Sequence, residues 1–463
     1  MSLLAQHQSR LRRLFLVFFY MAFAAMPLQA AQRPHVLMIS IDGMRPDYVT
    51  AADAHHLHVP TLRAFLKEGA YAEGVTGVVP TLTYPSHTTL VTGVWPSVHG
   101  IYANAKFDPT QNHKNDSYWY AKDIKVQTLW EAASAAGLST ANVGWPVTVG
   151  ARELDHSLPA VPPYERTSAN DEPNFLRQPY DHPSGLRKLA DTALPKVMPP
   201  GYEKRFYWGL YVMQRYKPDF MLVHLALLDH TEHMTGPFSE RSDRVLEAID
   251  SEVAQLIKTE QAIDPDSVIV IVSDHGFSPL HTRVNLGVLF AQAGLIDLAP
   301  RISAHHRVEV SSWKAQLWPT GGTTAVLLHN PSDAATRSKV KALLEKAASN
   351  PEYGIEKILS RDEAIQQGGF ADPRMAFVVA WKLGFSGGGA LTGPVIVPVA
   401  RGGAHGYLPE HPELHSSFFM EGKGVAKGRN LGEIDMRQIA PTVAEILGVH
   451  LPQGKLPPLH YQP

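Results

Sequence analysis

The chain has 463 residues, of which 44% are hydrophobic and 19% charged, as in an ordinary folded protein and not in a disordered one. Its 42 basic and 44 acidic residues give a net charge of -2, which excludes a general electrostatic attraction to nucleic acid or to an anionic membrane surface. Because it contains no cysteine, disulfides are excluded and any metal site must use histidine, carboxylate or hydroxyl ligands.

The N-terminus predicts a secretory signal. Arginines at positions 10, 12 and 13 precede the apolar run "LFLVFFYMAFAAMPL", which is short for a membrane span and is followed by "QAAQ". We therefore expect residues 1–30 to be a signal peptide, cleaved near Ala30. The mature chain would then be exported, periplasmic or secreted, and would carry no membrane span. A retained N-terminal anchor is the alternative.

Three short apolar runs rich in valine and isoleucine predict buried parallel strands, and each run leads to an aspartate. They are "HVLMISID" with Asp42, "DFMLVHLALLD" with Asp229, and "DSVIVIVSDHG" with Asp274. Helical patterns such as "TLWEAASAAGL" and "RSDRVLEAIDSEVAQLIKT" lie between them. This alternation predicts an α/β fold, a mostly parallel sheet with helices on both faces, whose ligands bind at the carboxyl ends of the strands.

The pattern changes at residue 295. A strand is predicted at "TTAVLLHN", a helix at "DAATRSKVKALLEKAA" and another strand at "MAFVVAWK", before the glycine-rich "GFSGGGALTG". We interpret residues 295–392 as an α+β cap inserted into a catalytic domain of residues 33–294 and 393–463. That domain ends on the helix "DMRQIAPTVAEILG", with Asp435 as its N-cap and Gly448 as its stop.

Two of the three strand-end aspartates have a histidine close to them in sequence. The acidic and histidine residues of these motifs are Asp42 in "SIDGM", Asp229 and His233 in "DHTEH", Asp274 and His275 in "SDHG", and His405 in "GGAHGY". Each of them alone is more often a turn, cap or buried residue, but together they indicate a metal site. Nitrogen and carboxylate ligands without thiolates suit zinc, with iron or manganese as alternatives, and this number of groups suffices for two ions.

The segment "VVPTLTYPSH" supplies a candidate nucleophile. Pro85 suits the first turn of a helix that continues through "SHTTLVTG", so the hydroxyl of Thr83 lies where free backbone N–H groups attract an anion. A threonine hydroxyl that is bound to a metal loses its proton readily enough to attack at neutral pH. An N-cap threonine without a catalytic role is the alternative interpretation.

Together these motifs carry a family resemblance. In chain order they are "ISIDGMRPDY", "PTLTYPSHTTLVTGVWPSVHGIYAN", "LDHTEHMTGP", "SDHG" and "GAHGYLP". The ordered set resembles the type I phosphodiesterase and nucleotide pyrophosphatase family, within the alkaline phosphatase superfamily, over nearly the whole mature chain. The resemblance implies an alkaline-phosphatase-like fold and an enzyme with two metal ions, typically zinc, with other divalent metals as alternatives.

The resemblance also implies ligand sets and a mechanism. The expected ligands are Asp229, His233 and His405 for one zinc, and Asp42, Asp274, His275 and the Thr83 oxygen for the other. Thr83 would displace the leaving group to give a phosphothreonine intermediate, which water then cleaves. Asn104 would donate a hydrogen bond to a non-bridging phosphoryl oxygen, and its alternative is a turn asparagine.

The chain departs from the family's pattern at several positions. Where the nucleotide pyrophosphatases usually have Thr-Phe-Pro-Asn-His, this chain has Tyr84, which keeps an aromatic face for a nucleobase, and Ser86, which removes an amide. His230 competes with His233 as a ligand, and the spacing favours His233. Tyr164 roughly matches a second base-binding tyrosine, with an exposed loop tyrosine as its alternative.

We therefore predict an exported zinc-dependent hydrolase of phosphodiester or pyrophosphate bonds. Its expected substrate is a small molecule of nucleotide type, and no stable complex with nucleic acid is expected. A phosphate monoesterase is the first alternative, but the Lys-x-Arg pair that it would need is absent from "STANVGWPVTVGA". Phosphonoacetate hydrolase is a further alternative, and a non-catalytic binding protein of the same fold is the alternative from another class.

Overall fold

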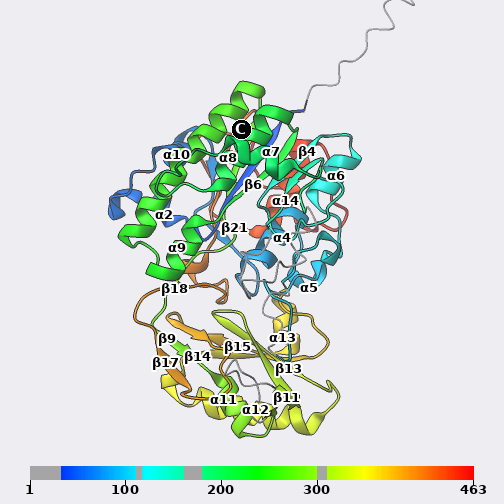
Figure 1. Ribbon diagram of the computed structural model, residues 1–463, viewed down its shortest axis with the longest axis vertical. Coiled ribbons are helices and arrows are strands. Elements are labelled where there is room, and N and C mark those ends of the chain that lie inside the picture. Colours follow the sequence, from blue (N-terminus) through cyan, green and yellow to red (C-terminus); the bar gives the residue numbers. More distant parts are fainter. Residues whose placement is uncertain (1–32, 111–116, 161–179, 300–309) are drawn as a thin grey trace, which may run out of the picture. The chain divides into compact units, whose positions relative to one another are not determined.

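The computed structural model describes residues 33–110, 117–160, 180–299 and 310–463 (Figure 1). The expected signal peptide and Tyr164 lie outside these residues, so both stay predictions. In the part of the chain that is described, none of the helices is long and apolar enough to cross a membrane.

The central feature within the described residues is a sheet of eight strands in the order β20-β2-β19-β7-β1-β6-β4-β5. Its strands are β20 (Arg429–Asn430), β2 (Ala70–Tyr71), β19 (Phe418–Gly422), β7 (Val268–Val272), β1 (Val36–Ile41), β6 (Phe220–Leu225), β4 (Thr140–Val143) and β5 (His156–Leu158). β1 pairs in parallel with both β6 and β7, whereas β19 runs antiparallel to β7 and β2. The predicted mostly parallel sheet is confirmed.

Helices cover both faces of this sheet (Figure 1). The helices are α3 (Pro60–Glu68), α8 (Lys204–Tyr216) and α10 (Glu240–Ile263) on one face, and α4 (Thr83–Thr92), α6 (Leu129–Ala135) and α14 (Ile439–Leu447) on the other. Side chains alternate along a strand. Leu37 and Ile39 of β1 therefore pack in the apolar cluster on the face of α3, α8 and α10, and Val36 and Met38 pack in the cluster on the opposite face. This double burial explains why the strand sequences read as continuous apolar runs.

A second sheet within the described residues is antiparallel, with the order β12-β13-β15-β14. Its strands are β12 (Ala315–Pro319), β13 (Thr323–Leu328), β15 (Met375–Trp381) and β14 (Ile355–Ser360). α12 (Ala334–Ala348) packs on one face through Val340 and Leu344. The other face packs against Val79 and Leu82, in the segment that leads to Thr83.

Two elements that precede residue 295 also pack with this second sheet. Val284 of β9 (Thr282–Val284) and Phe290 of α11 (Leu286–Gln292) belong to the same apolar cluster as α12. The division of the chain at residues 294 and 393 stays a prediction.

The run that contains Asp229 differs from its prediction. β6 ends early, and α9 (Leu227–Thr235) begins two residues later, so Asp229 lies in the first turn of a helix and not at a strand end. Glu203 explains the early start, since its carboxylate accepts hydrogen bonds from the backbone N–H of Ala226 at 2.8 Å and of the next residue at 3.3 Å. Helical spacing then puts His233 on the same face as Asp229.

His35 ties the start of β1 to the end of α10. Its ring nitrogen Nδ1 lies 3.0 Å from Glu260 Oε1, and its backbone N–H donates to Asp264 Oδ2 at 2.8 Å. The hydrogen bond with Glu260 is the main cause that raises the pKa of His35, against the opposing effect of burial.

We expect Glu260→Gln to lower the free energy of unfolding by roughly 1–2 kcal/mol below about pH 6, where the wild-type His35 is charged. Because the folded-state pKa is raised, this stabilisation is fully present below the unfolded-state pKa of about 6.5 and is lost as the pH rises through the folded-state value. Urea unfolding of both proteins across this range would measure it. A difference that does not shrink with rising pH would contradict the prediction.

Candidate active site

The carboxyl ends of three neighbouring strands meet at one edge of the central sheet. β7, β1 and β6 are adjacent and parallel, so the residues that follow them lie together. Asp42 follows β1, Asp274 follows β7, and α9 with Asp229 follows β6. The fold therefore brings together acidic residues that are far apart in the sequence.

The first group comprises Asp229, His233 and His405. His233 Nε2 lies 3.5 Å from Asp229 Oδ1, and His405 Nε2 lies 3.7 Å from the same oxygen. The two Nε2 atoms are 3.2 Å apart. Three donor atoms from α9 and from the loop at residue 405 thus converge on one point.

The second group comprises Asp42, Asp274 and His275, all of which are buried. His275 Nε2 lies 3.1 Å from Asp274 Oδ2 and 3.5 Å from Asp42 Oδ1. Thr83 Oγ1 lies 3.5 Å from the same nitrogen. The two groups adjoin, because the rings of His275 and His405 stack with their centroids 3.7 Å apart.

Backbone carbonyls orient the three histidines of these groups. Nδ1 of His233 lies 3.3 Å from the carbonyl of Gly403, Nδ1 of His405 lies 3.0 Å from that of Thr81, and Nδ1 of His275 lies 3.1 Å from that of its neighbour. A carbonyl only accepts, so each Nδ1 carries the hydrogen and each Nε2 presents a lone pair. The lone pairs of His233 and His405 repel each other at 3.2 Å unless a cation or proton lies between them.

The carboxylates show the same need for a cation. Oδ1 of Asp42, Oδ1 of Asp229 and Oδ2 of Asp274 are buried and have no hydrogen-bond partner among the described residues. These oxygens are the ones that face the histidine nitrogens. Burial, followed by neighbouring negative charge, raises the pKa of all three carboxyls, because a buried anion is costly.

Burial also lowers the pKa of the histidines, in the case of His405 to about 3, so the imidazoles are neutral. Neutral imidazole and ionised carboxylate are the forms that bind a divalent cation, which would supply the charge that the buried oxygens lack. The ligand atoms of Asp42, Asp274 and His275 lie within 4.8 Å of one another, as do those of Asp229, His275 and His405. These residues could therefore hold a metal ion.

Asn104 and Tyr84 lie beside Thr83. Thr83 is the first residue of α4 and is 8% exposed, and the backbone N–H of Tyr84 donates to Asn104 Oδ1 at 2.9 Å. Because Oδ1 accepts this bond, Nδ2 is the donor that Asn104 can offer to a ligand. Tyr84 is half-buried, and its ring meets that of Trp119 edge-on at 5.7 Å.

Two buried histidines that the sequence analysis did not single out also contact the site. His87 Nδ1 lies 2.8 Å from the backbone oxygen of Thr83 and 3.5 Å from Asp274 Oδ2. His224 Nε2 lies 2.9 Å from Asp42 Oδ2. Two sequence signals could have found them. His224 interrupts the apolar run of β6, and His87 lies one helical turn after Thr83.

Two further residues, His230 and Trp145, are not ligands in either group. His230, the competing ligand, is exposed and faces a hollow beside the first group. Trp145 is fully buried and packs edge-on against His87 at 4.7 Å, so it belongs to the core.

Comparison with known proteins identifies the family. The family model described as type I phosphodiesterase / nucleotide pyrophosphatase matches residues 36–408. The chain belongs to this family. The family and the fold class were both predicted correctly from the sequence, and the likeness to solved structures supports the fold class as well.

The relatives include proteins named as ectonucleotide pyrophosphatase/phosphodiesterases and as a bis(5'-adenosyl)-triphosphatase. Ectonucleotide pyrophosphatase/phosphodiesterase family member 1 of Rattus norvegicus is 25% identical over 255 residues, which cover 53% of this chain and 24% of that protein. Bis(5'-adenosyl)-triphosphatase ENPP4 of Bos taurus is 27% identical over 260 residues, which cover 54% of this chain and 49% of that protein. The match thus spans a quarter to a half of the length of these relatives.

Among solved structures, human ectonucleotide pyrophosphatase / phosphodiesterase 5 superposes with a TM-score of 0.63 at 19% identity, covering 90% of this chain and 95% of that one. Its murine counterpart, an inactive threonine-to-alanine variant in complex with AMP, has a TM-score of 0.62 at 19% identity and covers 92% of this chain and 96% of that one. At this identity the likeness concerns the fold alone.

The donor arrangement predicts that zinc stabilises the chain. Zinc in excess should raise the Tm of the metal-free protein by about 3 °C or more, because the ion binds only the folded arrangement of ligands. His405→Ala should lose most of this rise, and His450→Ala, which changes an exposed histidine, should keep it. Thermal unfolding followed by circular dichroism measures both, and an equal rise in the two variants would contradict the assignment.

Proposed function

We propose that the protein is a metal-dependent hydrolase of phosphodiester or pyrophosphate bonds and that Thr83 is its nucleophile. The observation that carries the proposal is the buried Thr83 Oγ1, 3.5 Å from His275 Nε2 at the edge of the second group. Membership of the type I phosphodiesterase / nucleotide pyrophosphatase family supports the reaction type. The names of the relatives, and AMP in the murine neighbour, support a nucleotide-type substrate.

We propose two metal ions, zinc or another divalent metal. The first group would hold one ion, and the second group together with Thr83 Oγ1 would hold the other. When bound, such ions stabilise negative charge on the oxygens around the phosphorus of an in-line displacement. The neutral imidazoles and the unpaired carboxylate oxygens described above support this assignment.

The chain's own residues would perform the remaining tasks. Thr83 Oγ1 would lose its proton to solvent and form a bond to phosphorus while the leaving group departs with its electron pair. Water would later break the resulting phosphothreonine bond, with its hydroxyl going to phosphorus and its proton returning to Thr83 Oγ1. The backbone N–H of Tyr84 is already donated to Asn104, so Asn104 Nδ2 is the donor expected at a non-bridging phosphoryl oxygen. The half-buried ring of Tyr84 offers a face to an aromatic substituent.

We also propose that the mature protein is exported. The arginines and the apolar run before residue 30 support this location. The prefix in the names of the ectonucleotide relatives supports it as well.

A phosphate monoesterase is the second candidate, and one contact favours it. Arg205 of α8 packs so closely against Gly144 that a Cβ atom added to Gly144 would lie 2.7 Å from Arg205 Cδ. Gly144 belongs to the segment in which such an enzyme would carry its Lys-x-Arg pair, so α8 brings a cation that the segment itself lacks.

Initial rates of the zinc-loaded mature chain would test the proposal with three substrates. They are bis-p-nitrophenyl phosphate, the p-nitrophenyl ester of a nucleoside monophosphate, and p-nitrophenyl phosphate. We expect the two diesters to be preferred, and Thr83→Ala and chelation each to lower kcat/KM by about 1,000-fold or more.

Each other outcome has a defined meaning. A preference for the monoester would make the enzyme a phosphatase, and activity that survives Thr83→Ala would overturn the assigned nucleophile. A chain that binds zinc and nucleotide but turns over none of the three substrates would be a binding protein of this fold.

Asn104→Asp provides a sharper test of the asparagine. Aspartate still accepts the hydrogen bond from the backbone of Tyr84, but it replaces the donor Nδ2 with an anionic oxygen. We expect kcat to fall by about 100-fold to 1,000-fold while the Tm stays within about 2 °C of wild type. An unchanged kcat would show that Asn104 does not contact the phosphoryl group.

A further inference from the structure

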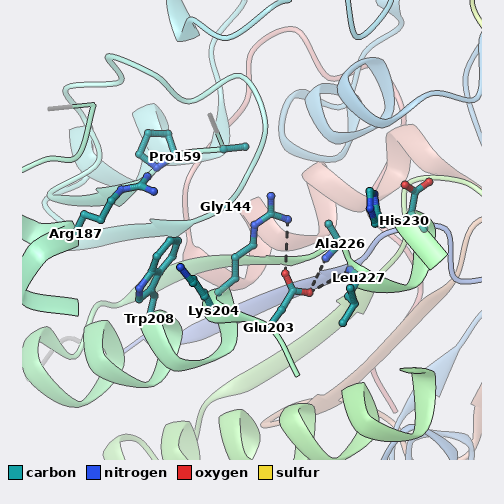
Figure 2. Close-up of a pocket in the computed structure, with 12 residues that line it drawn as sticks. Gly144, Pro159, Arg187, Glu203, Lys204, Trp208, Ala226, Leu227 and His230 are labelled. Carbon is teal, nitrogen blue, oxygen red and sulfur yellow. Dashed lines mark hydrogen bonds and ion pairs between the residues drawn. The ribbon is translucent and has the colours of Figure 1, made fainter. Parts of the chain in front are cut away.

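A hollow of about 380 Å³ lies beside the first group, against Asp229 and His230 of α9 (Figure 2). Its other walls come from the first turn of α8 and from α7 (Leu186–Ala190). Arg187 and Trp208 lie at one end of the hollow and His230 at the opposite end (Figure 2). The hollow thus extends away from the candidate metal ligands.

Three cationic side chains line this hollow, Arg187, Lys204 and Arg205. Its acidic lining consists of Glu203 and Asp229, and both are engaged. Glu203 accepts hydrogen bonds from the N-terminal backbone of α9, and Asp229 belongs to the first group. The lining therefore has a surplus of positive charge.

Lys204, which is exposed, contributes one of these positive charges. Among the described residues it has no hydrogen bond and no ion-pair partner, although it lies in the first turn of α8, where the helix dipole already favours an anion. Lys204 shares the lining with two arginines, so the three positive charges repel one another, and an anion among them would relieve this repulsion.

The two arginines are held in fixed positions. The side chain of Arg205 runs across Gly144, its Nη1 donates to the backbone oxygen of His224 at 3.4 Å, and Glu203 Oε2 lies 3.9 Å away. The guanidinium of Arg187 lies 4.9 Å from the centre of the Trp208 ring. Asp181 and Asp191 balance the charge of Arg187 in part, and Glu203 balances that of Arg205, so Lys204 is the cation with the least compensation.

We propose that this hollow binds a second anionic group of the substrate, a phosphate or carboxylate on a substituent of the scissile phosphate. The inference rests on the proposed function and names a substrate class for the same site. A diester phosphate carries one negative charge, which ions held by the first and second groups would compensate. With a neutral substituent, the cations of the hollow would therefore have no anion of the substrate to bind. Substrates whose substituent bears a further anion are therefore preferred over those whose substituents are neutral.

Kinetics with three aryl esters of one nucleoside monophosphate would test the hollow. The phenyl ring carries a para nitro, carboxylate or phosphonate group, so one ester lacks the additional anion and the other two distinguish its possible sources. Each variant is compared with the wild type on each ester, so that differences in leaving-group chemistry cancel. Lys204→Gln removes the uncompensated cation, and Lys188→Gln, an exposed lysine of α7 outside the lining, is the matched control.

We compare the ratio of kcat/KM for the anionic ester that the wild type prefers, carboxylate or phosphonate, to kcat/KM for the nitro ester. In Lys204→Gln we expect this ratio to fall by about fivefold to tenfold, mainly because KM for the anionic ester rises. Arg187→Gln should act in the same direction, and Lys188→Gln should keep the wild-type ratio. An equal fall for all three esters, or the same loss in Lys188→Gln, would overturn the proposal.

A binding measurement separates failure of the hollow from failure of the proposed function. Calorimetry with the zinc-loaded chain would compare a nucleoside monophosphate with a methylene-bridged nucleoside diphosphate, which is not hydrolysed. The diphosphate analogue should bind more tightly to the wild type, and Lys204→Gln should reduce this advantage about fivefold or more. If no ester is hydrolysed, the proposed function fails while this comparison still decides the hollow, and an unchanged advantage would refute the hollow alone.

Discussion

The candidate site depends on the burial of three carboxylates close to one another. Asp42, Asp229 and Asp274 each present a buried oxygen without a hydrogen-bond partner in the described structure. Buried charge without compensation costs several kcal/mol per ion, so this arrangement is stable only with a proton or a cation between the groups. The two packed faces of the central sheet hold the strand ends in place, and this rigidity keeps the carboxylates from moving apart.

Main-chain groups, and not further acids, orient the histidines around these carboxylates. The loop at His405 illustrates this, since its ring donates to the carbonyl of Thr81 while its own carbonyl accepts from the N–H of Gly322 at 2.8 Å. Gly322 precedes β13, so the second sheet is joined by a hydrogen bond to a candidate ligand. The orientation of the imidazoles thus depends on the backbone course of both sheets.

Sequence reasoning predicted the family and the α/β fold correctly, because ordered motifs and apolar runs are local signals. The place of Asp229 at a strand end was wrong, since the contact that starts α9 comes from Glu203, which no periodicity reveals. His224 was missed because a single histidine in an apolar strand reads as core. The approach of Arg205 to Gly144 depends on tertiary packing, and the roles of the site residues stay predictions.

Glu203 lies between the start of α9 and Arg205 of the hollow. One of its oxygens accepts from the start of α9, and the other lies 3.9 Å from Arg205 Nη1. One partly buried side chain therefore supports the ligand-bearing helix and an arginine of the hollow at once, and replacing it would disturb both. Lys204, next to it in sequence and exposed, can vary without affecting α9. Under the proposed role of the hollow, substrate preference can change at Lys204 without disturbing α9, whereas Glu203 is constrained on two sides.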